Sequence, residues 1–182
     1  MFDFVVVGSG GGSMCAALYM HSVGYSTCIL EKTDLVGGTT ARSGGVLWIP
    51  NNRFMQEAGI TDSHVKAVQY MEATAGKSED APGSTSERRL AYVTEAPKMI
   101  DFLVQQGIKL RRAPSWPDYY DERPGGSVSG RTVLADIFNL NELGEWKKKL
   151  RPNFMAVPAY HAEGFEISTF KSSFTGKFTL LK

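Results

Sequence analysis

The stretch Phe4-Val-Val-Val-Gly8-Ser-Gly10-Gly-Gly-Ser13 decides the fold of this chain of 182 residues. The apolar run from Phe4 to Val7 predicts a strand that is buried on both faces of a parallel sheet. Apolar residues then recur at helical spacing, and Gly24 is a typical helix stop. A second apolar run, Thr27 to Leu30, predicts the next strand. The order strand, helix, strand is a β-α-β unit, which indicates an α/β fold.

The glycine spacing in this stretch is the fingerprint of a dinucleotide site, with Ser13 at the place of the third glycine. Gly8 permits the tight turn, Gly10 lets the backbone approach a pyrophosphate, and a small residue at 13 lets helix and strand pack. The helix N-terminus offers free N–H groups and a partial positive charge to the phosphates. Glu31 follows Gly8 by 23 residues, where such sites carry an acid that accepts hydrogen bonds from ribose hydroxyls. The alternative for Glu31 is a solvated carboxylate at a strand end.

A second glycine-rich run begins soon after Glu31 and extends from Gly37 to Asn52. An NAD-binding domain would pass promptly to another helix and strand, whereas here the chain continues through Gly37-Gly38-Thr39-Thr40 and Ser43-Gly44-Gly45. Such a run brings backbone amides against a long, bent ligand, which favours FAD. A plain flexible loop and an NAD-dependent enzyme of the same fold stay open as alternatives.

Composition and charge exclude several classes of partner. The hydrophobic fraction of 42% and the charged fraction of 21% are those of an ordinary globular protein, and the net charge of +1 favours neither nucleic acid nor an anionic membrane. No apolar stretch approaches the roughly 20 residues of a membrane span, and no secretory signal precedes Phe4. Cys15 and Cys28 read as two buried thiols without the spacing of a zinc site. We therefore expect a cytoplasmic protein with no metal, no nucleic-acid partner and no membrane span.

The rest of the chain contains weaker signals. Asp62-Ser63 predicts the start of a helix that runs to Ala75, and residues 77–86 read as a surface loop. A helical segment around Leu90 follows, and Pro97 is expected to open a new helix, because proline is tolerated in a first turn. A short helix is expected over residues 142–150, with its lysines in solvent. No core pattern is visible from residue 151 to the apolar end at 178–182.

Together these motifs resemble the flavoprotein family of fumarate reductase and the 3-ketosteroid dehydrogenases, and within it the 3-ketosteroid Δ1-dehydrogenase branch most of all. The resemblance rests on Glu31-Lys32-Thr33-Asp34, on both glycine runs, on Trp48-Ile49-Pro50 and on Trp116-Pro117-Asp118-Tyr119-Tyr120. It implies FAD as the cofactor, bound non-covalently since the glycine-rich run has no histidine. By resemblance, the cofactor-binding residues are Gly8, Ser9, Gly10, Gly11 and Gly12 at the pyrophosphate, Glu31 at the adenosine ribose, Lys32, Gly38, Thr39 and Thr40 along the adenosine and ribityl region, and Ser43, Gly44 and Gly45 at the flavin ring.

The chemistry that the resemblance implies removes two hydrogens from adjacent carbons beside a carbonyl group. A tyrosine takes the proton, the flavin accepts a hydride, and a polarising group stabilises the enolate-like charge. Tyr119 matches the tyrosine that assists the base, so we expect a catalytic role for it; an aromatic residue that packs in a proline-bounded loop is the alternative. The small-molecule substrate is expected to be steroid-like or an activated alkene. Val46 replaces a small or hydroxyl residue of the steroid branch, so the substrate pocket is expected to differ.

The resemblance also implies a longer polypeptide. The expected fold class is α/β: residues 1–113 form the N-terminal part of an incomplete, Rossmann-like FAD-binding domain, and residues 114–182 lead irregularly into a truncated α+β substrate or cap region. The base and the carbonyl-polarising group would lie beyond Lys182, so we expect this chain alone to be inactive. Two alternatives stay open: a fumarate-reductase-like flavoprotein of another substrate class, and a non-catalytic FAD-binding fragment.

Overall fold

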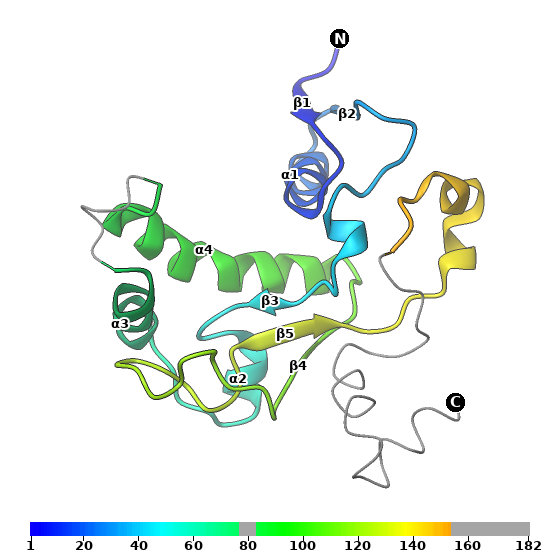
Figure 1. Ribbon diagram of the computed structural model, residues 1–182. Helices are drawn as coiled ribbons and strands as arrows, with labels where there is room; N and C mark the ends of the chain where they lie inside the picture. Colours follow the sequence, from blue (N-terminus) through cyan, green and yellow to red (C-terminus); the bar gives the residue numbers. More distant parts are fainter. Residues whose placement is uncertain (77–82, 154–182) are drawn as a thin grey trace, which may run out of the picture. The chain divides into compact units, whose positions relative to one another are not determined.

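The computed structural model describes residues 1–76 and 83–153, which fall into two compact units (Figure 1). Residues 1–45 and the described residues from 137 onward form the first, which we call the N-terminal unit. Residues 46–136 form the second, which we call the central unit. Most of the loop predicted over 77–86, and the apolar end at 178–182, lie outside the described residues.

The N-terminal unit contains the predicted β-α-β unit. β1 (Phe4–Val7) and β2 (Thr27–Leu30) are parallel, with Phe4 opposite Thr27 and Val7 opposite Leu30. α1 (Gly11–Ser22) connects them, and Gly24 follows it with a φ of +97°, a conformation that favours glycine. Strand, helix, stop signal and second strand are therefore confirmed.

The predicted burial of the first strand is wrong for the described residues. Phe4 and Val6 are half-buried, but Val5 and Val7 are 48% and 81% exposed. The sheet of the described unit has two strands and one connecting helix, so apolar side chains on one face have no neighbouring layer among the described residues. The unbroken apolar run is typical of a strand covered on both sides, and here only alternate residues are covered.

The N-terminal unit also contains two 3₁₀ segments. η1 (Thr40–Arg42) follows the glycines at 37 and 38, and the longer η3 (Leu140–Lys149), near the end of the described chain, lies where a short helix was expected. Gly144 interrupts η3 with a φ of +56°, and the three lysines at its end are exposed as predicted. Val36 forms a parallel bridge with Leu150, and its N–H donates to the Lys149 carbonyl oxygen at 2.8 Å.

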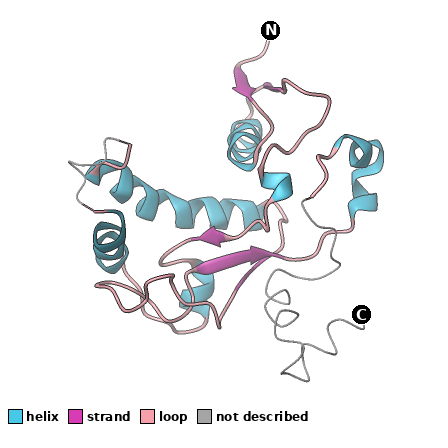
Figure 2. Ribbon diagram, viewed as in Figure 1, coloured by secondary structure: helices cyan, strands magenta, loops and turns pink. Residues whose placement is uncertain are grey.

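The central unit is built on a three-stranded antiparallel sheet. The strand order is β3 (Leu47–Trp48), β5 (Thr132–Ala135) and β4 (Leu110–Arg112), and α2 (Arg53–Glu57), α3 (His64–Ala75) and α4 (Ser86–Gln105) complete the unit (Figure 2). Its core joins helix and sheet through four buried side chains, those of Ile49, Ala96, Ile100 and Val133. No strand was predicted in this region, because these strands have only two to four residues and, unlike β1, no glycine fingerprint follows them.

The prediction that Pro97 opens a helix is wrong, because α4 is a single helix with Pro97 in its interior (Figure 1). An interior proline removes one backbone donor and costs about 3 kcal/mol in helix propensity. The buried residues Val93, Ala96 and Ile100 continue one face of the helix across the proline. Burial of this face offsets the local cost. Within the described residues, no helix is both long and apolar enough to cross a membrane.

The start of α3 is as predicted. Ser63 is its N-cap, and its hydroxyl oxygen accepts a hydrogen bond from the Lys66 N–H at 3.2 Å. The helix ends at Ala75, as expected, and Gly76 follows with a φ of +77°. Asp62, which precedes the cap, bonds instead to Arg131, the residue before β5, as described below.

The predicted domain boundary between residues 113 and 114 concerns the whole protein and stays a prediction. In this chain, β4 and β5 lie on either side of that point and pair with each other, with Arg112 opposite Val133. The loop between them, which contains the Tyr119 stretch, therefore begins and ends on one sheet.

We expect Ile100→Ala to destabilise the protein by about 2–5 kcal/mol, because Ile100 is fully buried and its loss leaves a cavity between α4 and the sheet. Urea unfolding of both proteins measures the change. Ile137→Ala is the matched control, since Ile137 is 56% exposed and its replacement should change the free energy of unfolding by less than about 0.5 kcal/mol. Equal losses in the two variants would contradict the packing described here.

Candidate nucleotide-binding site

The turn between β1 and α1 has the conformation that the glycine fingerprint requires. Gly8 has a φ of +92°, which favours glycine, and its N–H donates to the Leu30 carbonyl oxygen at 2.6 Å. This bond continues the pairing of β1 with β2 into the turn. A Cβ atom at Gly8 would lie 3.9 Å from the Ser13 hydroxyl oxygen, so the small residue at 13 packs beside the turn.

The N-terminus of α1 is suited to an anion. Gly10 is its N-cap and has no side chain to cap the helix, and no acidic residue stands in the first turn. The Gly11 N–H donates to the Thr40 hydroxyl oxygen at 2.9 Å. A helix N-terminus whose N-cap has no side chain presents backbone N–H groups and a partial positive charge, which is the environment that a pyrophosphate needs. The residues present therefore fit the phosphate part of a dinucleotide.

The second glycine run lies directly against the first. Gly38 has a φ of +54°, and a Cβ atom there would lie 3.2 Å from Gly10 Cα. A Cβ atom at Gly11 would lie 3.1 Å from the Thr40 methyl group. The positive φ and the close approach to the Gly10 backbone favour glycine at position 38. The structure thus brings together two segments that the sequence predicted to share one ligand.

Glu31 lies at the end of β2 and points to the glycine turn. Its Oε2 accepts from the Ser9 hydroxyl at 2.5 Å and from the Ser9 N–H at 3.1 Å, and its Oε1 accepts from the Thr33 N–H at 3.1 Å and hydroxyl at 3.2 Å. These hydrogen bonds, that of the Ser9 side chain first, lower the pKa of Glu31 to about 2. The carboxylate is therefore ionised at neutral pH and held in a fixed direction.

Ser9 makes a connection that the sequence analysis did not foresee. Its buried hydroxyl donates to Glu31 and accepts from the Gly37 N–H at 2.9 Å. One hydroxyl group thereby joins the first glycine turn, the acidic residue and the start of the second glycine run. The only hint of this connection in the sequence is the hydroxyl residue between Gly8 and Gly10.

The other residues expected at the cofactor lie along the second run or beside it. Thr39 is the N-cap of η1, and the Ser43 hydroxyl donates to the Thr40 carbonyl oxygen and accepts from the Gly45 N–H. The remaining exposed residues of the set are Gly12, Lys32 and Gly44. No hydrogen bond of the described residues links Lys32, Ser43, Gly44 or Gly45 to Glu31.

Arg151 is a further residue that sequence reasoning missed. Its Nη2 donates to the Thr33 hydroxyl oxygen at 2.9 Å, and Thr33 in turn bonds to Glu31. Its backbone N–H donates to the Val36 carbonyl oxygen at 2.9 Å. Arg151 and Thr33 are 118 residues apart in the sequence, so no local pattern could predict this contact.

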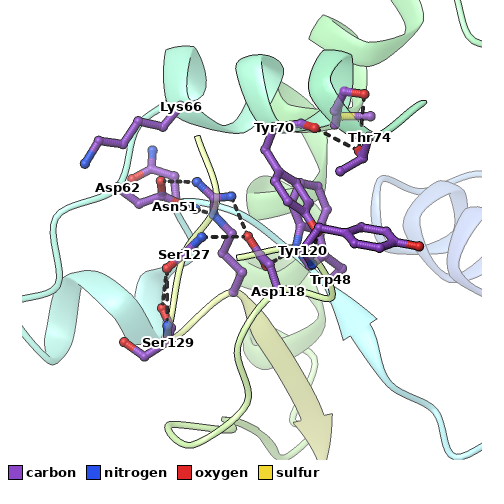
Figure 3. A network of polar contacts seen from close by, with 12 residues as sticks. Trp48, Asn51, Asp62, Lys66, Tyr70, Thr74, Asp118, Tyr120, Ser127 and Ser129 are labelled. Carbon is purple, nitrogen blue, oxygen red and sulfur yellow. Dashed lines mark hydrogen bonds and ion pairs between the residues drawn. The ribbon is translucent and has the colours of Figure 1, made fainter. Parts of the chain in front are cut away.

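The central unit contains Tyr119, whose side chain is 96% exposed. The residue before it, Asp118, is buried and belongs to a network with Arg131 and Asp62 (Figure 3). Arg131 Nε and Nη2 bond both oxygens of Asp62 at 2.9 and 2.7 Å, and Nη1 bonds Asp118 at 2.8 Å. Burial opposes the ionised form of Asp62, but the hydrogen bonds and charge of Arg131 outweigh it and lower the pKa of this carboxyl group.

Comparison with known proteins identifies the class. The family model described as "FAD binding domain" matches residues 3–170, so the chain belongs to this family. The predicted α/β FAD-binding fold and the predicted cofactor, FAD, are thereby confirmed.

Individual relatives confirm the predicted branch. The chain is 40% identical over 158 residues to a 3-oxosteroid 1-dehydrogenase of Mycolicibacterium smegmatis, covering 86% of this chain and 27% of the relative. It is 36% identical over 144 residues to the 4-oxocyclohexanecarboxylate 2-dehydrogenase of Sinomonas cyclohexanicum, covering 78% and 24%. The crystal structure of a 3-ketosteroid delta1-dehydrogenase from Sterolibacterium denitrificans, in complex with 1,4-androstadiene-3,17-dione, matches all of this chain and 32% of its own, with a TM-score of 0.83 and 33% identity. The chain thus spans about a third of these relatives or less.

We expect Ser9→Ala to raise the pKa of Glu31, because it removes the hydrogen bond that contributes most to the lowered value. The pKa of Glu31 in the folded protein lies below its ordinary value of 4.5, so its ionisation contributes stability above that pH and loses it as the pH falls toward about 2. A carbon NMR titration of the Glu31 carboxyl group measures both proteins. Ser43→Ala is the control and should leave the titration unchanged; a wild-type midpoint near 4.5 would contradict the geometry.

Gly38→Ala should destabilise the protein by about 1–3 kcal/mol, because alanine is strained at this positive φ and its Cβ meets Gly10. Gly12→Ala is the matched control: a Cβ there meets nothing within 4 Å, and alanine in α1 should stabilise by about 0.5–1 kcal/mol. Urea unfolding without cofactor gives both values. Equal tolerance of the two substitutions would argue against the close approach of the glycine runs.

Proposed function

We propose that the full-length protein is an FAD-dependent dehydrogenase that removes two hydrogens from adjacent carbons beside the carbonyl group of a 3-ketosteroid-like substrate. The 40% identity over 158 residues to a 3-oxosteroid 1-dehydrogenase carries this proposal. The likeness to a steroid-bound dehydrogenase, at 33% identity, supports it. In the chain itself, the support is an uncapped helix N-terminus, an ionised Glu31 and an exposed Tyr119.

The N-terminal unit would hold the cofactor. Ser9 and Thr33 fix the direction of the two carboxylate oxygens of Glu31. We therefore propose that Glu31 accepts hydrogen bonds from the hydroxyls of the adenosine ribose. The α1 N-terminus would bind the pyrophosphate through backbone N–H groups. FAD supplies the hydride acceptor when bound. We assign the other contacts as in the family: Gly8, Ser9, Gly10, Gly11 and Gly12 near the pyrophosphate, Lys32, Gly38, Thr39 and Thr40 along the adenosine and ribityl region, and Ser43, Gly44 and Gly45 at the flavin ring.

Tyr119 would assist the proton transfer. Its phenol group lies in solvent rather than in the core of the central unit, so it is available to a substrate or to a neighbouring base. The reaction also needs a base and a group that polarises the carbonyl, and we place both outside residues 1–182. We therefore propose that this chain alone binds FAD but turns over no substrate.

A smaller cyclic ketone is the second candidate substrate. The relative from Sinomonas cyclohexanicum is named for 4-oxocyclohexanecarboxylate, and it is 36% identical to this chain. Such a substrate shares the ring ketone of a 3-ketosteroid and adds a carboxylate. A fumarate-reductase-like activity on an activated alkene would run the same hydrogen transfer in the opposite direction.

A cytoplasmic location and the absence of a nucleic-acid partner also stay proposals. The support for the location is that Cys15 and Cys28 are both free thiols, as expected in a reducing compartment. The support against a nucleic-acid partner is the net charge of +1, which provides no basic field for a phosphate backbone.

The test is a flavin reduction assay with the full-length protein, purified with FAD. We expect a 3-ketosteroid to bleach the visible flavin band under anaerobic conditions, and an artificial electron acceptor to restore it. Tyr119→Phe should lower the rate of reduction by about 10–100-fold, since it removes a proton-transferring hydroxyl.

Tyr120→Phe is the matched control, half exposed beside Tyr119, and should reduce the rate less than about twofold. If 4-oxocyclohexanecarboxylate bleaches the flavin and no 3-ketosteroid does, the smaller cyclic ketone is the substrate class and the 3-ketosteroid proposal is wrong. Reoxidation of reduced flavin by fumarate alone would favour the fumarate-reductase-like alternative.

A further inference from the structure

The exposed Tyr119 follows a buried carboxylate that is fully engaged. Asp118 is 5% exposed, and its two oxygens accept three hydrogen bonds. Oδ1 accepts from Trp48 Nε1 at 2.6 Å, and Oδ2 accepts from Arg131 Nη1 at 2.8 Å and from the Ser127 N–H at 3.0 Å. A buried carboxylate needs such partners, and these come from β3, from the residue that precedes β5 and from the far side of the loop (Figure 3).

The backbone on both sides of Tyr119 is held as well. The Asp118 N–H donates to the Ser127 carbonyl oxygen at 2.9 Å, and the Tyr120 N–H donates to the Tyr70 hydroxyl oxygen at 3.2 Å. Tyr119 therefore lies between two fixed residues while its own side chain is almost wholly in solvent. Its position is set by its neighbours, because its ring is too exposed for packing to set it.

The rest of the loop packs on α3. Arg123 Nη1 donates to the Ala73 carbonyl oxygen at 2.6 Å, and its guanidinium lies 4.8 Å from the Tyr120 ring centroid. Gly125 has a φ of +76°, and a Cβ atom there would overlap Lys66 O. The loop is thus in backbone contact with the helix, and a side chain at this glycine would separate the two.

Arg131 connects this loop to the sheet and to α3. It is 1% exposed, binds Asp62 with two nitrogens and Asp118 with a third, and lies 5.6 and 5.7 Å from the ring centroids of Trp48 and Tyr70. The planar guanidinium fixes the directions of both carboxylates at once. A lysine could offer neither the paired geometry nor the flat contact with two rings.

We propose that Asp118, Arg131 and Trp48 are positioning residues that fix the backbone from which the Tyr119 side chain reaches the site of proton transfer. The inference rests on the proposed function, and Tyr70 contributes through its bond to the Tyr120 N–H. Proton transfer depends on distances near hydrogen-bond length, so a displacement of about 1 Å costs on the order of a hundredfold in rate. An exposed catalytic side chain therefore needs a rigid backbone beneath it.

Trp48→Phe in the full-length, FAD-loaded enzyme tests the proposal. It removes the indole N–H that bonds Asp118 and keeps an aromatic ring beside Arg131. We expect kcat for a 3-ketosteroid to fall about tenfold with KM changed less than about twofold, because the loss concerns the position of Tyr119. Trp146→Phe is the matched control, at a tryptophan that is 63% exposed in the other unit, and should leave kcat unchanged.

A double-mutant cycle separates positioning from general damage. In the Tyr119→Phe background, Trp48→Phe should lower kcat less than about twofold further, because the hydroxyl that it positions is already absent. An equal tenfold fall in both backgrounds would show a merely structural role and overturn the proposal. Asp118→Asn should reproduce the fall in kcat, since it removes the charge that binds Arg131.

Hydrogen exchange distinguishes failure of this proposal from failure of the proposed function. We expect the Asp118, Tyr120 and Ser127 amides of the substrate-free protein to exchange faster in Trp48→Phe than in wild type. Unchanged exchange in all three would overturn the positioning role, whatever the activity. If these amides exchange faster in Trp48→Phe but the wild-type enzyme oxidises no 3-ketosteroid, the residues do fix the loop. The proposed function is then wrong.

Discussion

The N-terminal unit depends on one hydroxyl group. Ser9 donates to Glu31 and accepts from Gly37, so a single buried hydroxyl sets the distance between the strand-to-helix turn, the acid at the end of β2 and the second glycine run. The close backbone approach of Gly38 to Gly10 follows from this connection, because Gly37 is already held. The N-terminus of α1, whose N-cap has no side chain, thus lies beside the second glycine run, where the Gly11 N–H donates to Thr40.

The central unit uses a different principle. There, an arginine lies between two carboxylates and two aromatic rings, and all of these groups are removed from most of the solvent. Such a cluster is costly unless each charge has its partners, and here every carboxylate oxygen accepts a hydrogen bond. The result is a loop of defined shape, although it contains no helix or strand. The N-terminal unit achieves the same end through glycine and backbone contacts.

How far the sequence predicts the structure differs between these two sites. The glycine spacing and Glu31 are local patterns, so the β-α-β unit and the meeting of the two glycine runs could be predicted. Arg131 and Asp62 are 69 residues apart, and no period or motif connects them. The prediction that Pro97 begins a helix was wrong, because burial of one face of α4 outweighs the unfavourable helix propensity of proline. The strands of the central sheet escaped detection because they have only two to four residues and, unlike β1, no glycine fingerprint follows them.

The pairing of residues 33–36 with residues 149–151 has a consequence for how the protein folds. Arg151 contacts Thr33 across 118 residues, and the whole central unit lies between them in the chain. Closing a flexible loop of that length is slow and entropically costly, whereas a compact insert brings its two ends into a defined range before they pair. During synthesis, the pairing of Thr33 and Val36 with Arg151 must therefore wait for the central unit. A slow step in the insert delays this pairing even though the insert contributes no atom to it.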